Sequence, residues 1–90
     1  MNLYHGTKKE YLDSILKKGL KRGQNNGDSV YIYTTETPEE ASKWGDVVLQ
    51  IESKESDDLR IWPDEKPVWQ VMFMNDIKPE QIIIYKDASR

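Results

Sequence analysis

Residues 3–20 read Leu3-Tyr4-His5-Gly6-Thr7-Lys8-Lys9-Glu10-Tyr11-Leu12-Asp13-Ser14-Ile15-Leu16-Lys17-Lys18-Gly19-Leu20. The first part predicts a strand over residues 2–5, which brings His5, the one histidine of the chain, to a glycine turn. The second part predicts an amphipathic helix over residues 8–18, because apolar residues recur there at helical spacing. Gly19 suits the left-handed position that ends such a helix. We therefore expect the fold to begin with a strand, a turn and a helix.

Two further signals belong to this helix. Thr7 and Glu10 have the spacing of a capping box, in which the hydroxyl and the carboxylate each accept a hydrogen bond from the other residue's amide. One stripe of the helix is apolar and is expected to face the core. It consists of Tyr11, Leu12, Ile15 and Leu16.

Runs of β-branched and aromatic residues predict four more strands. They cover residues 30–34, 47–51, 68–74 and 81–85. The run at 47–51 is almost continuously apolar, which is typical of a central strand. Two helices near the start and strands throughout predict an α+β domain with a mostly antiparallel or mixed sheet.

The connections carry their own signals. Thr37-Pro38-Glu39-Glu40 is a second capping box with proline at the first helical position, so a short helix is expected there. This helix should carry Ala41 and Trp44 inward and end at Gly45. Residues 53–66 are acidic and contain proline, and we expect an irregular, solvated loop.

Composition limits the classes of protein that fit. Ninety residues allow one domain, covering 1–90. The net charge of −3 makes a nucleic-acid partner unexpected, because such proteins are usually basic. No apolar run is long enough to span a membrane, and no secretion signal is present. The absence of cysteine excludes disulfides and thiolate metal sites, and it is compatible with the cytoplasmic location that we expect.

Three places carry candidate chemistry. His5 is either a histidine bonded to the backbone of a half-buried strand or a ligand-binding residue, and with no second histidine or cysteine we expect no metal. Tyr31 and Tyr33 share one strand face, where they either cover a helix or form a stacking platform for a flat ring such as nicotinamide. Gln70 interrupts an apolar strand and either faces solvent or points into a pocket.

Taken in order, these motifs resemble the ADP-ribosyltransferase-like superfamily. The match is nearest to the catalytic lobe of RNA 2′-phosphotransferases, with a second likeness to the branch that carries His, Tyr and Glu around NAD. The motifs that carry it are Leu3-Tyr4-His5-Gly6-Thr7, Ile15-Leu16-Lys17-Lys18-Gly19-Leu20, Val30-Tyr31-Ile32-Tyr33-Thr34, Val47-Val48-Leu49-Gln50-Ile51, Val68-Trp69-Gln70-Val71 and Ile77-Lys78-Pro79-Glu80-Gln81-Ile82. The resemblance implies a minimal form of that fold, a split and mostly antiparallel sheet with two short helices.

The resemblance also implies a site. It makes His5, Tyr31 and Gln70 the catalytic residues: His5 orients the dinucleotide, Tyr31 stacks on nicotinamide, and Gln70 contacts the ribose. The NAD-binding residues that it implies are His5, Gly6, Thr7, Tyr31 and Tyr33. NAD, or a nucleotide like ADP-ribose, is the expected ligand.

Two departures from the family pattern matter. Gln70 stands where transferases carry a glutamate, and a neutral amide stabilises a developing positive charge less than a carboxylate does. The RNA-processing relatives have an additional N-terminal lobe and arginines that grip phosphate. This chain starts at the histidine strand and has only Arg22, Arg60 and Arg90, so removal of a 2′-phosphate from RNA is not expected.

Three functions remain open at this point. The first is an NAD-dependent transferase that modifies a protein or another macromolecule. The second is a catalytically inactive member, of a size that suits a phage protein, which binds a nucleotide or inhibits a host enzyme. Its contact surface would be the acidic region around Glu55, Asp57, Asp58 and Trp62. The third is a structural domain without a ligand.

Overall fold

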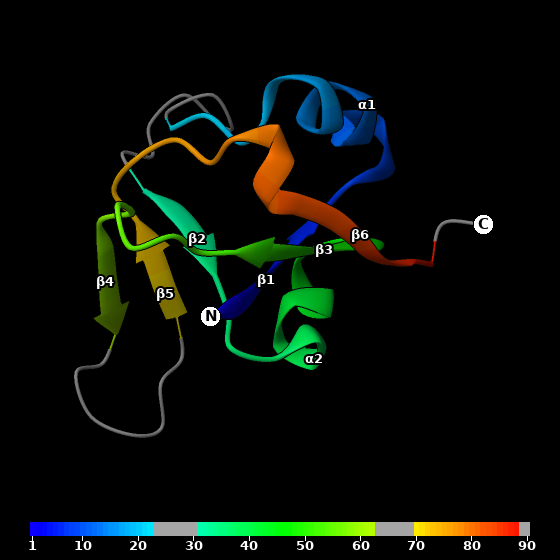
Figure 1. Ribbon diagram of the computed structural model, residues 1–90. Helices are drawn as coiled ribbons and strands as arrows, with labels where there is room; N and C mark the ends of the chain where they lie inside the picture. The colour runs from blue at the N-terminus through cyan, green and yellow to red at the C-terminus, as the bar shows by residue number, and fades with distance from the viewer. Residues whose placement is uncertain (23–30, 63–69, 89–90) are drawn as a thin grey trace.

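The computed structural model describes residues 1–22, 31–62 and 70–88 (Figure 1). Its helical and extended elements alternate along the chain. They are β1 (Asn2–Thr7), α1 (Lys9–Lys18), β2 (Ile32–Thr34), α2 (Pro38–Ala41), the 3₁₀ turn η1 (Ser42–Trp44), β3 (Val47–Glu52), β4 (Leu59–Trp62), β5 (Gln70–Phe73), the 3₁₀ turn η2 (Pro79–Gln81) and β6 (Ile82–Asp87). The chain is an α+β protein, as its sequence predicts.

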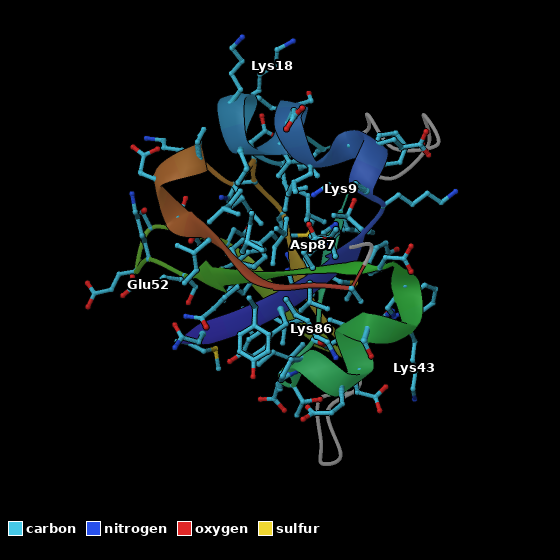
Figure 2. The ribbon with its side chains drawn as sticks, turned by 90° about the vertical axis from the view of Figure 1, so that its right-hand side faces the viewer. Lys9, Lys18, Lys43, Glu52, Lys86 and Asp87 are labelled. Atoms are coloured by element: carbon cyan, nitrogen blue, oxygen red, sulfur yellow. The ribbon has the colours of Figure 1, made fainter. Side chains whose placement is uncertain are left out.

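The strands form two antiparallel sheets of three strands each, in the orders β1-β3-β6 and β2-β5-β4. One short bridge joins them: the amides of Tyr4 and Thr35 each donate to the other residue's carbonyl, at 2.9 and 2.8 Å. The sheet is therefore split, and β1 and β2 border the split. Helices α1 and α2 lie on opposite sides of the β1-β3-β6 sheet (Figures 1 and 2).

The core is built around β3, the middle strand of its sheet. Val47, Leu49 and Ile51 are each 0% exposed, which confirms the prediction of a central strand. Both sheets, helix α1 and the connections contribute to one cluster of buried apolar side chains. It comprises Leu3, Leu12, Ile15, Leu20, Ile32, Val47, Leu49, Ile51, Val71, Phe73, Ile77 and Ile82.

Helix α1 differs from its prediction at the N-terminus. The capping box is wrong, because Lys8 is the N-cap residue and its side chain makes no capping hydrogen bond. Thr7 instead continues β1, where it pairs with Val47 and is buried. Pairing with β3 thus extends the strand by two residues and takes Thr7 out of capping position.

The apolar stripe of α1 is narrower than predicted. Leu12 and Ile15 are buried, whereas Tyr11 and Leu16 are 45% and 40% exposed. The helix contacts η2 and β6, and only the line through Leu12 and Ile15 reaches the core. Gly19 ends the helix at a φ of 82° with its amide donating to Ile15 at 2.7 Å, which confirms the predicted stop.

The second helical segment is confirmed only in part. Thr37 Oγ1 accepts from the Glu40 amide at 3.3 Å, and Ala41 is fully buried. Trp44, however, is 64% exposed, so its prediction as a core residue is wrong. The α-helix ends at Ala41, and Trp44 is the last residue of the 3₁₀ turn that follows, so it is not part of the helix whose inner face Ala41 occupies.

The acidic connection is more ordered than predicted. Residues 59–62 form β4, which pairs with β5, so an irregular loop is wrong for this part. Predicted strand residues Val30, Val68 and Trp69, together with residues 63–66 of the predicted loop, lie outside the described part of the chain. The last strand begins at Ile82 and runs to Asp87, because η2 occupies residues 79–81.

A polar cluster ties this connection to η2. Asp57 accepts hydrogen bonds from the Lys54 amide at 2.7 Å, from Asn75 Nδ2 at 2.8 Å and from Gln81 Nε2 at 3.0 Å. Asn75 Oδ1 accepts from the Asp58 amide at 2.7 Å. These hydrogen bonds lower the pKa of Asp57, although partial burial opposes them. We call Asp57, Asn75 and Gln81 the polar clamp.

Candidate functional site

The candidate site is a pocket at the split between the sheets, with a volume of about 670 Å³. Pockets that hold small ligands and cofactors fall in the range of roughly 300–1,000 Å³. Its walls come from both sheets, from α1 and from the segment of α2 and η1. The lining residues are 4–8, 31–35, Tyr11, Leu20, Lys21, Ala41, Trp44 and Gln70. We call it the junction pocket.

Every site residue expected from the sequence lines this one pocket. They are His5, Gly6, Thr7, Tyr31, Tyr33 and Gln70. They come from three strands or strand ends that are far apart along the chain, and the bridge between Tyr4 and Thr35 brings two of those strands together. The structure thus places the predicted residues side by side; their chemical roles remain predictions.

His5 projects from β1, and its ring is tethered to the neighbouring sheet. Its Nδ1 atom lies 2.7 Å from the Tyr33 carbonyl oxygen. A carbonyl oxygen only accepts, so Nδ1 carries the proton and Nε2 is left as an acceptor in the neutral ring. Burial lowers the pKa of His5, and the hydrogen bond to Tyr33 opposes this only in part. The imidazole is therefore neutral at pH 7.

Tyr31 and Tyr33 supply aromatic surface to the pocket. Their ring centroids are 6.2 Å apart, and the rings meet edge to face at 71°. Such pairs are more favourable than a face-to-face sandwich, and they hold both rings in fixed orientations. Tyr33 is 43% exposed, so the pair reaches from the pocket wall to the surface.

Gln70 opens β5 and is half-buried at the pocket wall. Among the described residues its side chain has no hydrogen-bond partner. The sequence predicts that Gln70 either faces solvent or points into a pocket, and the structure places it in the pocket wall. The amide offers a donor and an acceptor at neutral charge, which allows it to bind a hydroxyl or a carboxamide but not to balance a positive charge.

The glycine at position 6 is required by a close approach. A Cβ atom built on Gly6 would lie 1.9 Å from the Ala41 carbonyl oxygen and 3.1 Å from the Trp44 Cβ atom. Only glycine lets the α2–η1 segment sit this near to β1. Thr7 is buried and presents little surface to a ligand.

Ten lining residues are not among the predicted site residues, and they include Lys8, Tyr11, Lys21 and Trp44. The sequence predicts Tyr11 and Trp44 as core residues. Lys8 and Lys21 are cations, and the described lining residues include no carboxylate, although Lys21 Nζ also lies 3.9 Å from Asp76 Oδ2 outside the pocket lining. The pocket therefore favours an anionic ligand. The signal in the sequence is the position of Lys8 directly after His5-Gly6-Thr7, which belongs to β1 and does not form the predicted glycine turn.

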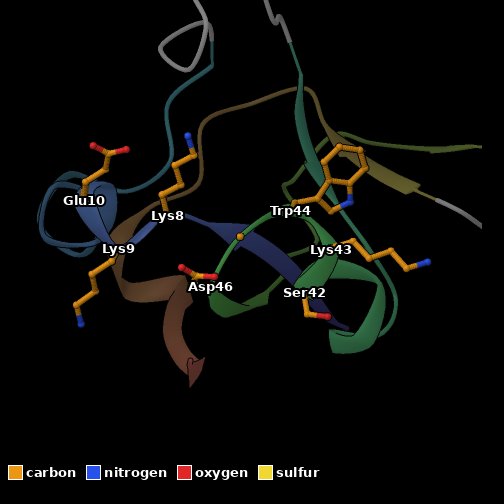
Figure 3. A pocket seen from close by; sticks show the side chains of 8 residues that line it. Lys8, Lys9, Glu10, Ser42, Lys43, Trp44 and Asp46 are labelled. Carbon is orange, nitrogen blue, oxygen red and sulfur yellow. The ribbon is translucent and has the colours of Figure 1, made fainter. Parts of the chain in front are cut away.

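A shallower hollow lies beside the junction pocket and shares Lys8 and Trp44 with it (Figure 3). Its other two lysines are paired with carboxylates. Lys9 forms an ion pair with Asp87, where the two side chains are labelled in Figure 2, and Lys43 lies 3.1 Å from Glu40. This outer hollow is open and lacks an aromatic wall apart from Trp44, so it is the weaker candidate.

Within residues 1–22, 31–62 and 70–88, no three metal-binding side chains gather, and no helix is long and apolar enough to cross a membrane. No model of a known protein family matches the chain. The ADP-ribosyltransferase-like family therefore stays a prediction from the sequence motifs.

Proposed function

We propose that the chain is an ADP-ribosyltransferase-like protein that binds NAD in the junction pocket and transfers ADP-ribose to a protein or another macromolecule. The observation that supports this most is the convergence of His5, Tyr31, Tyr33 and Gln70 on one pocket. The sequence resemblance implies the same residues as a site. The proposal includes a cytoplasmic location, where NAD is available.

The pocket chemistry suits a dinucleotide. Tyrosine rings favour flat heteroaromatic rings through burial and stacking. Lysine ammonium groups at Lys8 and Lys21 favour the two phosphates. The Nε2 atom of His5 is an acceptor for a ribose hydroxyl, since the proton is held on Nδ1 by Tyr33. Gln70 offers a second neutral hydrogen-bonding group on another strand.

In the proposed reaction, the bond between nicotinamide and the ribose C1′ breaks, and nicotinamide leaves with the bonding electrons. An acceptor atom of the target then forms the new bond at C1′ and loses its proton. The chain contributes position, because His5 and Gln70 hold ribose hydroxyls while Tyr31 holds the ring. Positioning and electrostatics supply most of the acceleration in such steps.

One observation favours the second candidate function, a nucleotide-binding member without transferase activity. The described lining residues include no carboxylate, and Gln70 is neutral. Positive charge that develops on the ribose would thus be stabilised less than beside a glutamate. Such a protein would sequester a nucleotide or inhibit a host enzyme.

Two measurements test these alternatives. Isothermal titration with NAD and with ADP-ribose asks whether the pocket binds either one, and mass spectrometry asks whether NAD is consumed. A transferase should consume NAD as wild type, and Gln70→Ala should lower the rate by about 100-fold. An inactive binder should leave NAD intact, whereas Gln70→Glu should create or raise hydrolysis.

Two variants serve as controls. Leu16→Ala removes an exposed apolar side chain outside the junction pocket, and Tyr85→Ala removes an exposed tyrosine whose ring packs edge to face on the lining residue Tyr4 at 5.3 Å. Both should bind and turn over NAD as wild type does. If wild type binds neither NAD nor ADP-ribose, both candidate functions are wrong.

A further inference from the structure

Trp44 is the most exposed large hydrophobic residue of the described chain. Its exposed fraction is 64%, although the burial of an aromatic side chain is strongly favourable. It borders both the junction pocket and the outer hollow. The exposed indole at the edge of the pocket is thus not accounted for by packing in the core.

The position of Trp44 is fixed by two close backbone approaches. A Cβ atom on Gly6 would meet the Ala41 carbonyl oxygen at 1.9 Å, and a Cβ atom on Gly45 would meet the Thr7 carbonyl oxygen at 2.1 Å. The η1 turn is therefore seated directly on β1, with glycine on each side of the contact. Trp44 stands on a rigid turn and not on a free loop.

Trp44 is also separate from the tyrosine pair. Tyr31 and Tyr33 contact each other at 6.2 Å, but Trp44 makes no ring contact with an aromatic side chain of the described residues. Trp44 and the Tyr31–Tyr33 pair are thus two separate aromatic surfaces of the pocket, which is also lined by Tyr11 and by Tyr4, whose ring packs on Tyr85 at 5.3 Å. Lys8 lines the same pocket, and Figure 3 shows Lys8 and Trp44 rising on the same side of the chain while Lys9 points the other way.

We propose that Trp44 is a second ring-binding surface of the junction pocket and that it stacks on the adenine of a dinucleotide. The inference rests on the proposed function, which assigns nicotinamide to Tyr31. A ligand with two flat rings joined by two phosphates matches two aromatic surfaces with lysines in the same pocket. The pocket accordingly selects a dinucleotide over either of its halves.

The test compares four probes on wild type and variants by isothermal titration: NAD, ADP-ribose, AMP and nicotinamide mononucleotide. Trp44→Ala should weaken the three adenine-containing probes by about 5- to 150-fold, the range for one stacked base, and leave nicotinamide mononucleotide within about 2-fold. Trp44→Phe should retain most of the affinity. Tyr85→Ala should bind all four as wild type does.

The outcomes separate this inference from the proposed function. If wild type binds neither NAD nor ADP-ribose, the proposed function and the inference fail together. If wild type binds NAD and Trp44→Ala binds every probe equally well, only the inference is overturned, and a loss of transfer to a protein target in that variant would assign Trp44 to the acceptor. An equal loss for all four probes also overturns it. Thermal melting of Trp44→Ala near the wild-type midpoint verifies that the variant is folded.

Discussion

The junction pocket and the polar clamp use similar side chains in opposite ways. In the clamp, Asp57, Asn75 and Gln81 bind one another and the nearby backbone, at distances of 2.7 to 3.1 Å. In the junction pocket, His5 uses one ring nitrogen to hold its orientation and leaves the other available, and Gln70 has no partner among the described residues.

This difference distinguishes polar groups that stabilise the fold from polar groups that can bind a ligand. A buried or half-buried polar group is costly unless it is paired, so a fully paired cluster stabilises the fold. A polar group that is held in one orientation and still has an unused hydrogen-bond donor or acceptor is suited to bind a ligand. The two glutamines express this most clearly, because Gln81 makes three hydrogen bonds and Gln70 makes none with the described residues.

The largest effect on stability is expected from a substitution in the core, which supports both regions. Leu12→Ala should lower the free energy of unfolding by about 2–5 kcal/mol, because Leu12 is only 4% exposed and its truncation leaves a cavity. Leu16, four residues later on the same helix, is 40% exposed, and Leu16→Ala should cost less than about 1 kcal/mol. Urea unfolding of the two variants provides the measurement; equal losses would contradict the burial of α1.

The matched pair Gln81→Leu and Gln70→Leu tests the comparison itself. Gln81→Leu removes one hydrogen-bond partner each from the Lys78 amide, the Glu52 carbonyl and Asp57, so it should cost about 2–3 kcal/mol of stability. Gln70→Leu should change stability by less than about 0.5 kcal/mol. Chemical denaturation gives both values. The distinction between the two regions would be lost if Gln70→Leu were the more damaging change.

Ligand binding should depend on the junction pocket and not on the polar clamp. Tyr31→Ala should weaken NAD binding by about 1–3 kcal/mol, the scale of ring stacking on an aromatic side chain. Gln81→Leu, assayed where it remains folded, and Tyr85→Ala should bind NAD as wild type does. Isothermal titration measures all three, and a loss of affinity in Gln81→Leu equal to that in Tyr31→Ala would show that the clamp also shapes the pocket.

The smallest effect is the pH dependence of stability. Burial lowers the pKa of His5 below its ordinary 6.5, so the unfolded chain binds a proton before the native protein does as pH falls. Stability should therefore decrease as pH drops below about 6.5, by at most about 1.4 kcal/mol per pH unit. The lowered pKa of Asp57 adds a second loss only below about pH 3.8.

Thermal melting of wild type and His5→Gln between about pH 2.5 and 8 separates the two groups. The variant should lose the dependence near pH 6 and keep the one in acid. A wild-type midpoint that does not change between pH 7 and 5 would mean that the ring is as well solvated in the folded protein as in the unfolded chain.

Much of the fold and the candidate site could be predicted from the sequence. The apolar run at 47–51 indicated the central strand, and Gly19 indicated the end of α1, because both depend on local chemistry. The convergence of His5, Tyr31 and Gln70 could be expected only through a family resemblance. Their position around one pocket depends on how the two sheets are joined, which no local sequence pattern encodes.

The failures have physical causes too. Residues 59–62 lie among acidic neighbours, and pairing with β5 makes them a strand that composition does not indicate. Periodicity places Tyr11 and Trp44 on apolar faces but does not say how wide the contact with the core is. Thr7 has the spacing of a cap, yet its pairing with Val47 outweighs that local preference.

The position of β3 between β1 and β6 also governs the order in which this chain can assemble. The first and last strands flank the same central strand, and Lys9 pairs with Asp87 from nearly the other end of the sequence. During synthesis, β1 and β3 can pair well before β6 leaves the ribosome, so one edge of β3 stays open until then. Non-local pairing of this kind slows folding, and an open apolar strand edge invites association with other chains. Residues 82–87 thus complete the sheet by pairing with the open edge of β3. This pairing ends the period in which the nascent protein is most prone to aggregate.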